Sequence, residues 1–168
     1  MNKVHVEAYA YSLHKQQEEL CGDRVKMISN ALGFIMVLSD GLGSGVKANI
    51  LATMTTTVLS QLLIEGIELH EALETMEMIL PECKERKIAY STFAILQVFY
   101  DGRAKLIEFD TPQSIWLRHG QSQPMPMETL IFGNRTIREM EFVVEIGDYI
   151  MLLSDGLLHA SRGMVLNF

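Results

Sequence analysis

Cysteine is scarce in this sequence, which has only Cys21 and Cys83 among its 168 residues and no CxxC pair. This scarcity argues against a disulfide framework and against a zinc site built on paired thiolates, so we expect both thiols to be reduced. The five histidines also lack HxH or HExxH spacing. A metal site in this chain is therefore expected to use carboxylates.

Basic clusters and long apolar runs are missing as well. The formal net charge is −7, with acidic and basic residues interspersed, which argues against a surface for nucleic acid or anionic membrane. No stretch approaches the length of a membrane span, and the first residues lack the apolar core of a signal peptide. We therefore expect a cytoplasmic protein that binds neither nucleic acid nor membrane. If such an acidic protein handles a phosphorylated partner, cations must bring the two together.

What the sequence does contain is one phrase written twice. Residues 34–43 read FIMVLSDGLG and residues 149–158 read YIMLLSDGLL, identical at seven of ten positions. Each apolar run ends in Ser-Asp-Gly, which predicts a buried strand ending at a carboxylate, Asp40 in the first copy and Asp155 in the second. A charge that leaves the core at such a place needs a partner or a metal ion. Brought together, the two strand ends would form a cation site.

An Asp-Gly pair, taken alone, is more often a tight turn than a functional site. Asp101-Gly102 is such a case, because it separates two apolar segments and predicts a plain hairpin. The first Ser-Asp-Gly differs, since it runs into the glycine-rich residues 41–45 and then a helix. The second differs because it follows Gly147-Asp148.

The glycine-rich segment 41–45 can bring backbone amides close to a phosphate or a metal-bound ligand. A Walker loop needs Gly-Lys followed by Ser or Thr, but here Val46 precedes Lys47 and Ala48 follows it. The Rossmann fingerprint fits as poorly, because its third glycine and its later acidic residue are only loosely matched. A nucleotide-binding switch is therefore the weakest of the functions considered.

Hydrophobic periodicity predicts the remaining elements. We expect strands at 4–10 and 20–28, helices at 46–65 and 69–80, and a strand-rich segment from 88 to 153. Gly66 is the expected C-cap of the first helix, and Pro81 ends the second. Strands, two helices and strands again predict an α+β fold in which helices cover a sheet, in a single domain of residues 1–168.

Asp23 is a third candidate ligand, because its predicted strand can neighbour the strand that ends at Asp40. A solvated charge beside Arg24 explains Asp23 equally well. A site of Asp23, Asp40 and Asp155 has only oxygen donors, which favour Mg²⁺ or Mn²⁺ over zinc or copper. Two such ions about 3.5 to 4 Å apart can bridge a water, lower its pKa and place it for attack on phosphorus.

Four segments together resemble the phosphatase domain of stage II sporulation protein E, in the bacterial branch of the metal-dependent Ser/Thr protein phosphatases. They occur in family order at residues 21–23 (CGD), 39–48 (SDGLGSGVKA), 90–92 (YST) and 147–156 (GDYIMLLSDG). The resemblance implies a central antiparallel β-sandwich flanked by helices, in the layer order α-β-β-α, with two Mn²⁺ or Mg²⁺ ions at one end.

The resemblance also implies roles for single residues. Asp40 and the Gly41 carbonyl would hold the bridged metals, Asp23 would join the same cluster, and Asp155 would bind the second metal. Thr92 would be structural support near this site. The implied activity is hydrolysis of phosphoserine or phosphothreonine through a metal-bridged water. Its substrate would be a regulatory protein of the anti-sigma-factor-antagonist type, in sporulation or stress signalling.

Two departures from the family pattern affect this interpretation. The family ends its motif set with Asp-Asp-x-Thr some tens of residues after Ser-Asp-Gly, but this sequence stops at Phe168. We therefore expect that the chain lacks its C-terminal part. The alternative is a catalytically incomplete pseudophosphatase that binds a phosphoprotein or scaffolds a complex. No phosphate-binding arginine is obvious either, and Arg24 is expected to be a surface charge.

Overall fold

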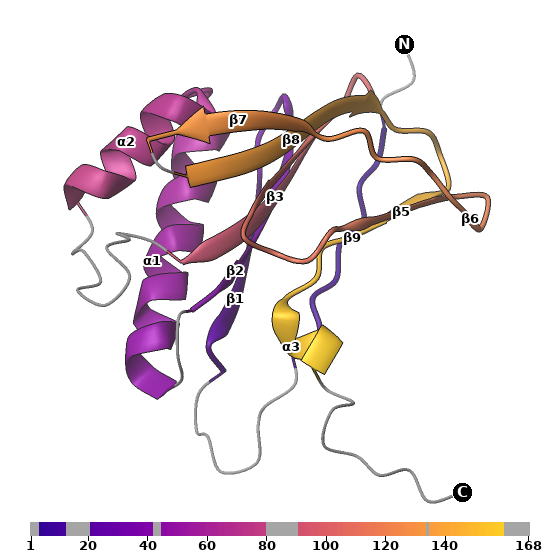
Figure 1. Cartoon of the computed structure of the whole chain (residues 1–168). Helices are drawn as coiled ribbons and strands as arrows, with labels where there is room; N and C mark the ends of the chain where they lie inside the picture. The colour runs from indigo at the N-terminus through magenta and orange to yellow at the C-terminus, as the bar shows by residue number, and fades with distance from the viewer. Residues whose placement is uncertain (1–3, 13–20, 42–44, 80–90, 134, 160–168) are drawn as a thin grey trace, which may run out of the picture.

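The computed structural model describes residues 4–12, 21–41, 45–79, 91–133 and 135–159 (Figure 1). The helices are α1 (Gly45–Ile64), α2 (Leu69–Ile79) and α3 (Asp155–His159). The strands are β1 (Asp23–Ser29), β2 (Gly33–Asp40), β3 (Thr92–Phe99), β4 (Arg103–Phe109), β5 (Ile115–Arg118), β6 (Gln121–Ser122), β7 (Glu128–Phe132), β8 (Arg135–Val143) and β9 (Asp148–Met151). None of the helices in these ranges is long and apolar enough to cross a membrane.

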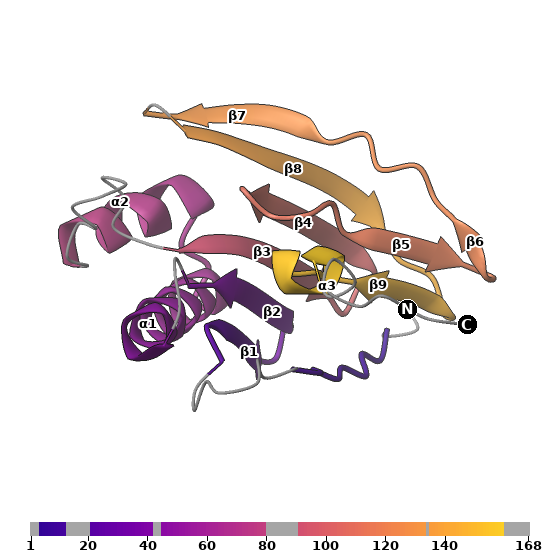
Figure 2. The same ribbon diagram turned by 60° about the horizontal axis from the view of Figure 1, so that its bottom comes forward.

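The strands form two antiparallel sheets. The larger has the strand order β1-β2-β3-β4-β8-β7, and the smaller has the order β6-β5-β9. Figures 1 and 2 show the smaller sheet on one side of the larger sheet, with α1 and α2 on the other side. The predicted α+β fold with an antiparallel sandwich is therefore confirmed. Within the described residues, both long helices cover the same face of the larger sheet.

One hydrophobic core lies between the helices and the larger sheet. Alternate residues of the central strands face it, namely Ile35, Val37, Phe93, Ile95, Ile107 and Phe109. The helices contribute Leu59, Leu63, Ala72, Leu73 and Met76. Burying a Leu, Ile or Phe side chain stabilises the fold by about 1.5 to 3 kcal/mol. This layer therefore fixes α1 across β1 and β2, where the first Ser-Asp-Gly ends.

Both predicted helices are confirmed to within one residue at each end. Gly66 has a φ of 88°, and its N–H donates to the Leu63 carbonyl at 3.1 Å, as expected of a residue that ends a helix. The predicted hairpin at Asp101-Gly102 joins β3 to β4, and Gly102 has a φ of 98°. Pro81 lies outside the described residues.

A second core lies between the two sheets. The opposite face of β3 and β4 presents Leu96, Val98 and Ala104, and Ile150 and Leu152 pack against them from the second phrase. The Trp116 and Phe142 rings, from β5 and β8, lie 4.6 Å apart between their centroids. The same central strands are thus buried on both faces, which explains why they read as continuous apolar runs.

The strand predicted at 4–10 is wrong, because residues 4–12 form no strand. The Val4 N–H donates to the Tyr100 carbonyl at 3.0 Å. Val4 and Val6 pack against the second core. The alternation of apolar residues therefore reflects packing of an extended segment, without the ladder of hydrogen bonds that defines a strand.

The second copy of the repeated phrase also departs from prediction. β9 ends at Met151, so Asp155 does not end a strand but begins α3 after a three-residue connection. Tyr149 and Met151 are 68% and 40% exposed, whereas the first copy forms the buried strand β2 that ends at Asp40 as predicted. Tyr149 and Met151 face outward because β9 belongs to the smaller sheet, which buries only its inner face in the described residues.

Candidate metal centre

Asp23 and Asp40 lie opposite each other at one end of the larger sheet. Asp23 is the first residue of β1 and Asp40 is the last residue of β2, and the antiparallel register pairs them directly. Directly paired residues have their Cβ atoms about 4.5 to 5.5 Å apart on the same face of a sheet. Two like charges so placed destabilise the pair unless a cation or a proton lies between them. Asp40 also pairs with Thr92 of β3.

Gly41 brings the first turn of α1 against this strand end. A Cβ built on Gly41 would lie 2.2 Å from the Ala48 carbonyl oxygen, which is closer than real atoms approach. No other residue therefore fits without moving α1. The Gly41 N–H donates to the Gly22 carbonyl at 3.2 Å, which ties the residue after Asp40 to the residue before Asp23.

Further hydrogen bonds hold the backbone on both sides of the carboxylate pair. The Asn49 side chain, on α1, donates from Nδ2 to the Cys21 carbonyl at 2.7 Å. The Thr92 hydroxyl donates to the Asp40 carbonyl at 3.3 Å, and the Ser39 hydroxyl donates to the Thr92 carbonyl at 2.7 Å. Thr92 therefore supports the backbone of Asp40.

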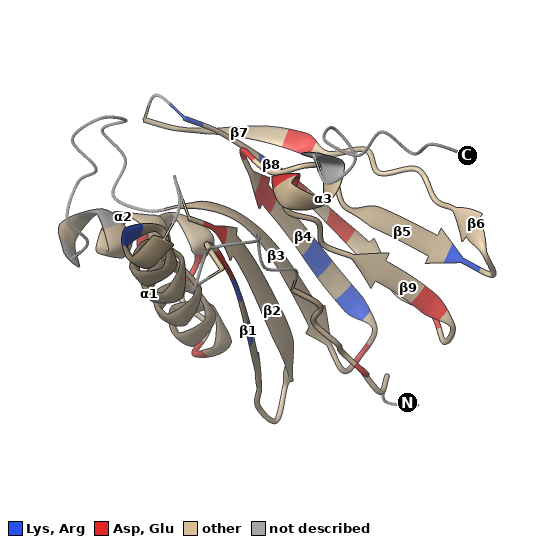
Figure 3. Cartoon of the chain, turned by 90° about the horizontal axis from the view of Figure 1, so that it is seen from below, with Lys and Arg blue, Asp and Glu red and all other residues tan. Residues whose placement is uncertain are grey.

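The second phrase contacts the Asp23–Asp40 pair through residues that follow β9 of the smaller sheet. Ser154 Oγ donates to Asp23 Oδ2 at 2.7 Å, although the two residues are 131 positions apart in the chain. Figure 1 shows α3 at the same lower end of the molecule as the start of β1. Figure 3 views that end from below and marks the acidic positions in red. The structure therefore brings Asp23, Asp40 and Asp155, all predicted site residues, to one end of the sandwich.

The electrostatics of Asp40 indicate a site suited to cations. Burial, hydrogen bonding to Asp155 and the negative charges of Asp23 and Asp155 raise the pKa of Asp40 from 3.8 to about 8. Without a cation, a carboxyl group in this position holds its proton at neutral pH. A divalent ion reverses this balance, because it favours the ionised form of every carboxylate around it.

The donor chemistry fits Mg²⁺ or Mn²⁺, which prefer carboxylate and carbonyl oxygens. The fit is partial, because no three Asp, Glu, His or Cys side chains of the described residues are already arranged to hold a metal ion. Asp40 lies close to both other carboxylates, while Asp155 is exposed on α3.

Comparison with known proteins places the chain in a family. The family model for stage II sporulation protein E (SpoIIE) matches residues 31–167. The chain belongs to the SpoIIE family. It is 26% identical over 146 residues to stage II sporulation protein E of Bacillus subtilis (strain 168), covering 84% of this chain and 18% of that protein.

Solved structures related to the SpoIIE family share the fold. The PP2C phosphatase domain of SpoIIE from Bacillus subtilis, with a fragment of its regulatory domain, matches with a TM-score of 0.71 at 22% identity over 86% of this chain and 44% of that chain. The RsbU and RsbW domains of Rv1364c from Mycobacterium tuberculosis match with a TM-score of 0.69 at 18% identity, covering 85% of this chain and 42% of that chain. RsbX in complex with magnesium matches with a TM-score of 0.64 at 22% identity, covering 88% of this chain and 72% of that chain. The chain thus spans less than half of the first two solved chains.

Not every acidic residue in the SpoIIE-like segments lies at this site. Asp148 accepts two hydrogen bonds of 2.8 Å from Arg118, which also lies within 2.7 Å of Glu145. Hydrogen bonding to Arg118 holds the pKa of Asp148 below its ordinary value. Asp148 therefore fastens β9 to β5 as a structural ion pair. Arg24 is exposed on β1, as expected of a surface charge.

Two contacts of the candidate metal centre were not predicted from the sequence, those of Ser154 and Asn49. The signal for Ser154 was present, because a serine precedes the aspartate in both copies of the phrase. No sequence signal marked Asn49, since its partner Cys21 is 28 positions away and is reached only through the packing of α1.

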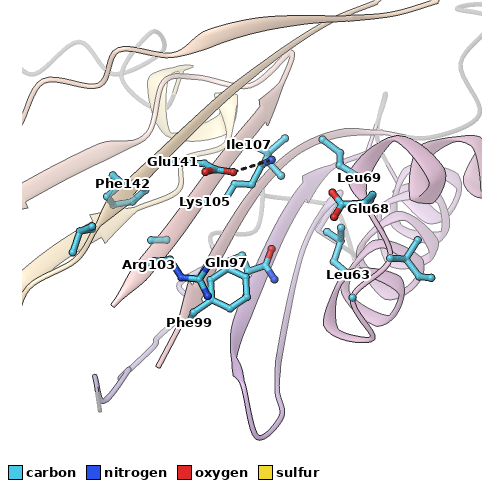
Figure 4. Close-up of a pocket in the computed structure, with 14 residues that line it drawn as sticks. Leu63, Glu68, Leu69, Gln97, Phe99, Arg103, Lys105, Ile107, Glu141 and Phe142 are labelled. Carbon is cyan, nitrogen blue, oxygen red and sulfur yellow. Dashed lines mark ion pairs between the residues drawn. The ribbon is translucent and has the colours of Figure 1, made fainter. Parts of the chain in front are cut away.

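A cavity of about 580 Å³ lies at the opposite end of α1 from the carboxylates (Figure 4). Leu63 and Phe99 line it together with Lys105. Lys105 is paired with Glu139 at 2.8 Å and with Glu141 at 3.6 Å, so its charge is already balanced. The cavity is therefore separate from the candidate metal centre.

Proposed function

We propose that this chain is a metal-dependent protein phosphatase that hydrolyses phosphoserine or phosphothreonine on a regulatory protein in the cytoplasm. The observation that carries the proposal is the meeting of three carboxylates around Asp40, whose pKa is raised to about 8. Such a cluster is costly unless divalent cations bind it. Membership of the SpoIIE family supports the same reaction class. We also propose that residues 1–168 act as a single phosphatase-type domain.

In this proposal the metal ligands come from two segments that are far apart in the sequence. The Asp40 carboxylate and the Gly41 carbonyl would hold two bridged Mn²⁺ or Mg²⁺ ions. Asp23 would complete the same cluster, and Asp155 would bind the second ion from α3. When bound, the ions supply a water of lowered pKa for attack on phosphorus and neutralise charge on the phosphoryl oxygens.

The residues of the chain orient this chemistry. Asp23 and Asp40 start with a fixed separation because the β1–β2 register pairs them, so little rearrangement is needed on metal binding. Gly41 keeps the floor of the site free of a side chain, since the first turn of α1 lies directly behind it.

We propose a substrate of the anti-sigma-factor-antagonist type. The structural matches behind this choice include RsbU and RsbW domains and a chain from a structure of the bacterial stressosome, matched with a TM-score of 0.66. These relatives are under 25% identical and support only the fold in common.

A second candidate function is a pseudophosphatase that binds a phosphoprotein without hydrolysing it. The observation that favours it is the absence, within the described ranges, of three side chains already arranged as metal ligands. In that case binding of the phosphoprotein would not depend on the carboxylate cluster around Asp40.

Turnover of a phosphoserine-bearing anti-sigma-factor antagonist in Mn²⁺ separates the two candidates. We expect release of phosphate by the wild-type chain and a loss in Asp40→Asn larger than the about 10- to 100-fold typical of changes around metal ligands. Asp101→Asn is the matched control, because it alters an Asp-Gly pair in an exposed hairpin. If wild type and Asp40→Asn are equally inert but both bind the phosphoprotein, the pseudophosphatase is correct and the enzyme proposal is wrong.

A further inference from the structure

The serine of the second phrase contacts the candidate metal centre directly. Ser154 lies between β9 and α3, and its hydroxyl donates to Asp23 Oδ2 at 2.7 Å. Asp155, the next residue, lies within hydrogen-bonding reach of Asp40. Two consecutive residues thus serve the cluster. Ser154 donates a hydrogen bond to the Asp23 carboxylate, and Asp155 supplies a carboxylate of its own.

The first phrase offers an internal comparison at the same position. Ser39 is fully buried, and its hydroxyl donates to the Thr92 backbone carbonyl at 2.7 Å. The same residue type in the same motif therefore does different things. Ser39 joins the backbones of β2 and β3, whereas Ser154 contacts a carboxylate side chain.

We propose that Ser154 is a positioning residue that orients the Asp23 carboxylate toward a divalent cation. This inference rests on the metal centre proposed above. A carboxylate has about four acceptor sites on its two oxygens, so the bond to Oδ2 leaves acceptor sites free for a metal. A hydrogen bond between a hydroxyl and an ionised carboxylate is charge-assisted, and so it holds the side chain in one orientation.

Serine suits this role because its side chain is uncharged. A lysine or arginine at position 154 would also orient Asp23, but its positive charge would repel the incoming cation. A hydroxyl fixes the carboxylate without opposing metal binding. Side chains that hold metal ligands in this way typically change metal affinity by about 10- to 100-fold when removed.

The same bond holds Asp155 in place. The β9 ladder ends at Met151, so residues 152–154 have no strand partner of their own in the described structure. Gly156 lies close by, since a Cβ there would be 3.9 Å from Asp23 Oδ2. Ser154 therefore anchors the start of α3 to β1, and loss of its hydroxyl should weaken the contributions of two carboxylates.

Titration with Mn²⁺ alone tests the inference, by calorimetry and by the electron paramagnetic resonance signal of unbound Mn²⁺. The decisive pair is Ser154→Thr and Ser154→Val, which have nearly the same shape and differ in the hydroxyl. We expect Ser154→Thr to retain wild-type affinity and Ser154→Val to bind about 10- to 100-fold more weakly. Ser60→Ala is the matched control, because it removes another buried serine hydroxyl, which donates to the Thr57 carbonyl within α1 and touches none of the three carboxylates, and so should leave Mn²⁺ affinity unchanged.

The outcomes separate this inference from the proposed function. Equal affinities of the Thr and Val variants, with wild type binding Mn²⁺, would overturn the positioning role and leave the metal centre intact. No binding of Mn²⁺ by wild type would overturn both. A fall in affinity in Ser60→Ala as large as that in Ser154→Val would show a general loss of stability, and would also overturn the role assigned to Ser154.

Discussion

Replacement of Asp40 by asparagine should stabilise the metal-free protein and remove its response to Mn²⁺. In the metal-free wild type, Asp40 is either protonated, because its pKa is raised to about 8, or ionised beside the negative charges of Asp23 and Asp155. Both states cost free energy at neutral pH, whereas an asparagine amide of nearly the same shape carries no charge. The substitution therefore removes a penalty that exists only while the cation is absent.

The gain in stability of Asp40→Asn can be calculated from the repulsion between neighbouring carboxylates. Two unit charges 4 Å apart repel by about 1 kcal/mol in water and by about 4 kcal/mol near a protein surface. Asp155 is exposed and Asp40 only partly buried, so we take the low part of this range, about 1 to 2 kcal/mol. For a domain of this size, 1 kcal/mol shifts the melting temperature by about 2 to 4 °C. We therefore expect Asp40→Asn to melt about 2 to 8 °C above metal-free wild type.

Addition of Mn²⁺ should reverse the order of the two proteins. At a hundred times the dissociation constant, a bound ion stabilises the native state by about 2.7 kcal/mol. Wild type should gain this stabilisation and Asp40→Asn should gain almost none. Differential scanning fluorimetry with and without Mn²⁺ measures the crossing, with Asp101→Asn as the control that responds like wild type. A lower metal-free melting temperature in Asp40→Asn, or an equal gain from Mn²⁺, would refute the reasoning.

Two further predictions test the support around the site. Gly41→Ala should lower the free energy of unfolding by about 1 to 3 kcal/mol in urea titration, because the added Cβ would lie 2.2 Å from the Ala48 carbonyl oxygen; an unchanged midpoint would contradict the close approach of α1. Asp148→Asn should destabilise by about 1.5 to 3 kcal/mol at pH 7, since charged hydrogen bonds to Arg118 are lost. The pKa of Asp148 is lowered in the folded state, so wild type has this stabilisation above pH 4 and loses it as the pH falls further. The stabilities of the two proteins should therefore converge as the pH falls below 4, and a constant difference would show that the ion pair is not the cause.

The part of the site formed by Asp23 and Asp40 could be predicted from sequence, because local patterns determine it. The apolar run of β2 ends at Asp40 as expected, and the neighbouring strand β1 begins at Asp23. Short antiparallel connections make such a register predictable, since consecutive strands usually pair. The extents of both helices followed from their apolar spacing in the same way, but the buried face of α1 did not, because it includes Thr55 and Ser60 whereas Ile50 is exposed.

The part of the site formed by Ser154 and Asp155 depends on tertiary packing, which sequence periodicity does not report. The segments 4–10 and 149–155 have the composition of strands, yet only Asp148–Met151 pairs in a sheet. Periodicity reports which residues are buried but not whether the backbone finds a strand partner. The Ser154 and Asn49 contacts likewise depend on where α3 and α1 pack, which no local pattern specifies.

The bond between Ser154 and Asp23 has a consequence for the order of folding. It joins the first strand to the last helix across 131 residues, and contacts of such long sequence separation form slowly because the chain must first close a large loop. The Asp23–Asp40 pair can assemble as soon as β1 and β2 meet, well before α3 arrives. A cation held by all three carboxylates would therefore require both the local β1–β2 pairing and this long-range contact.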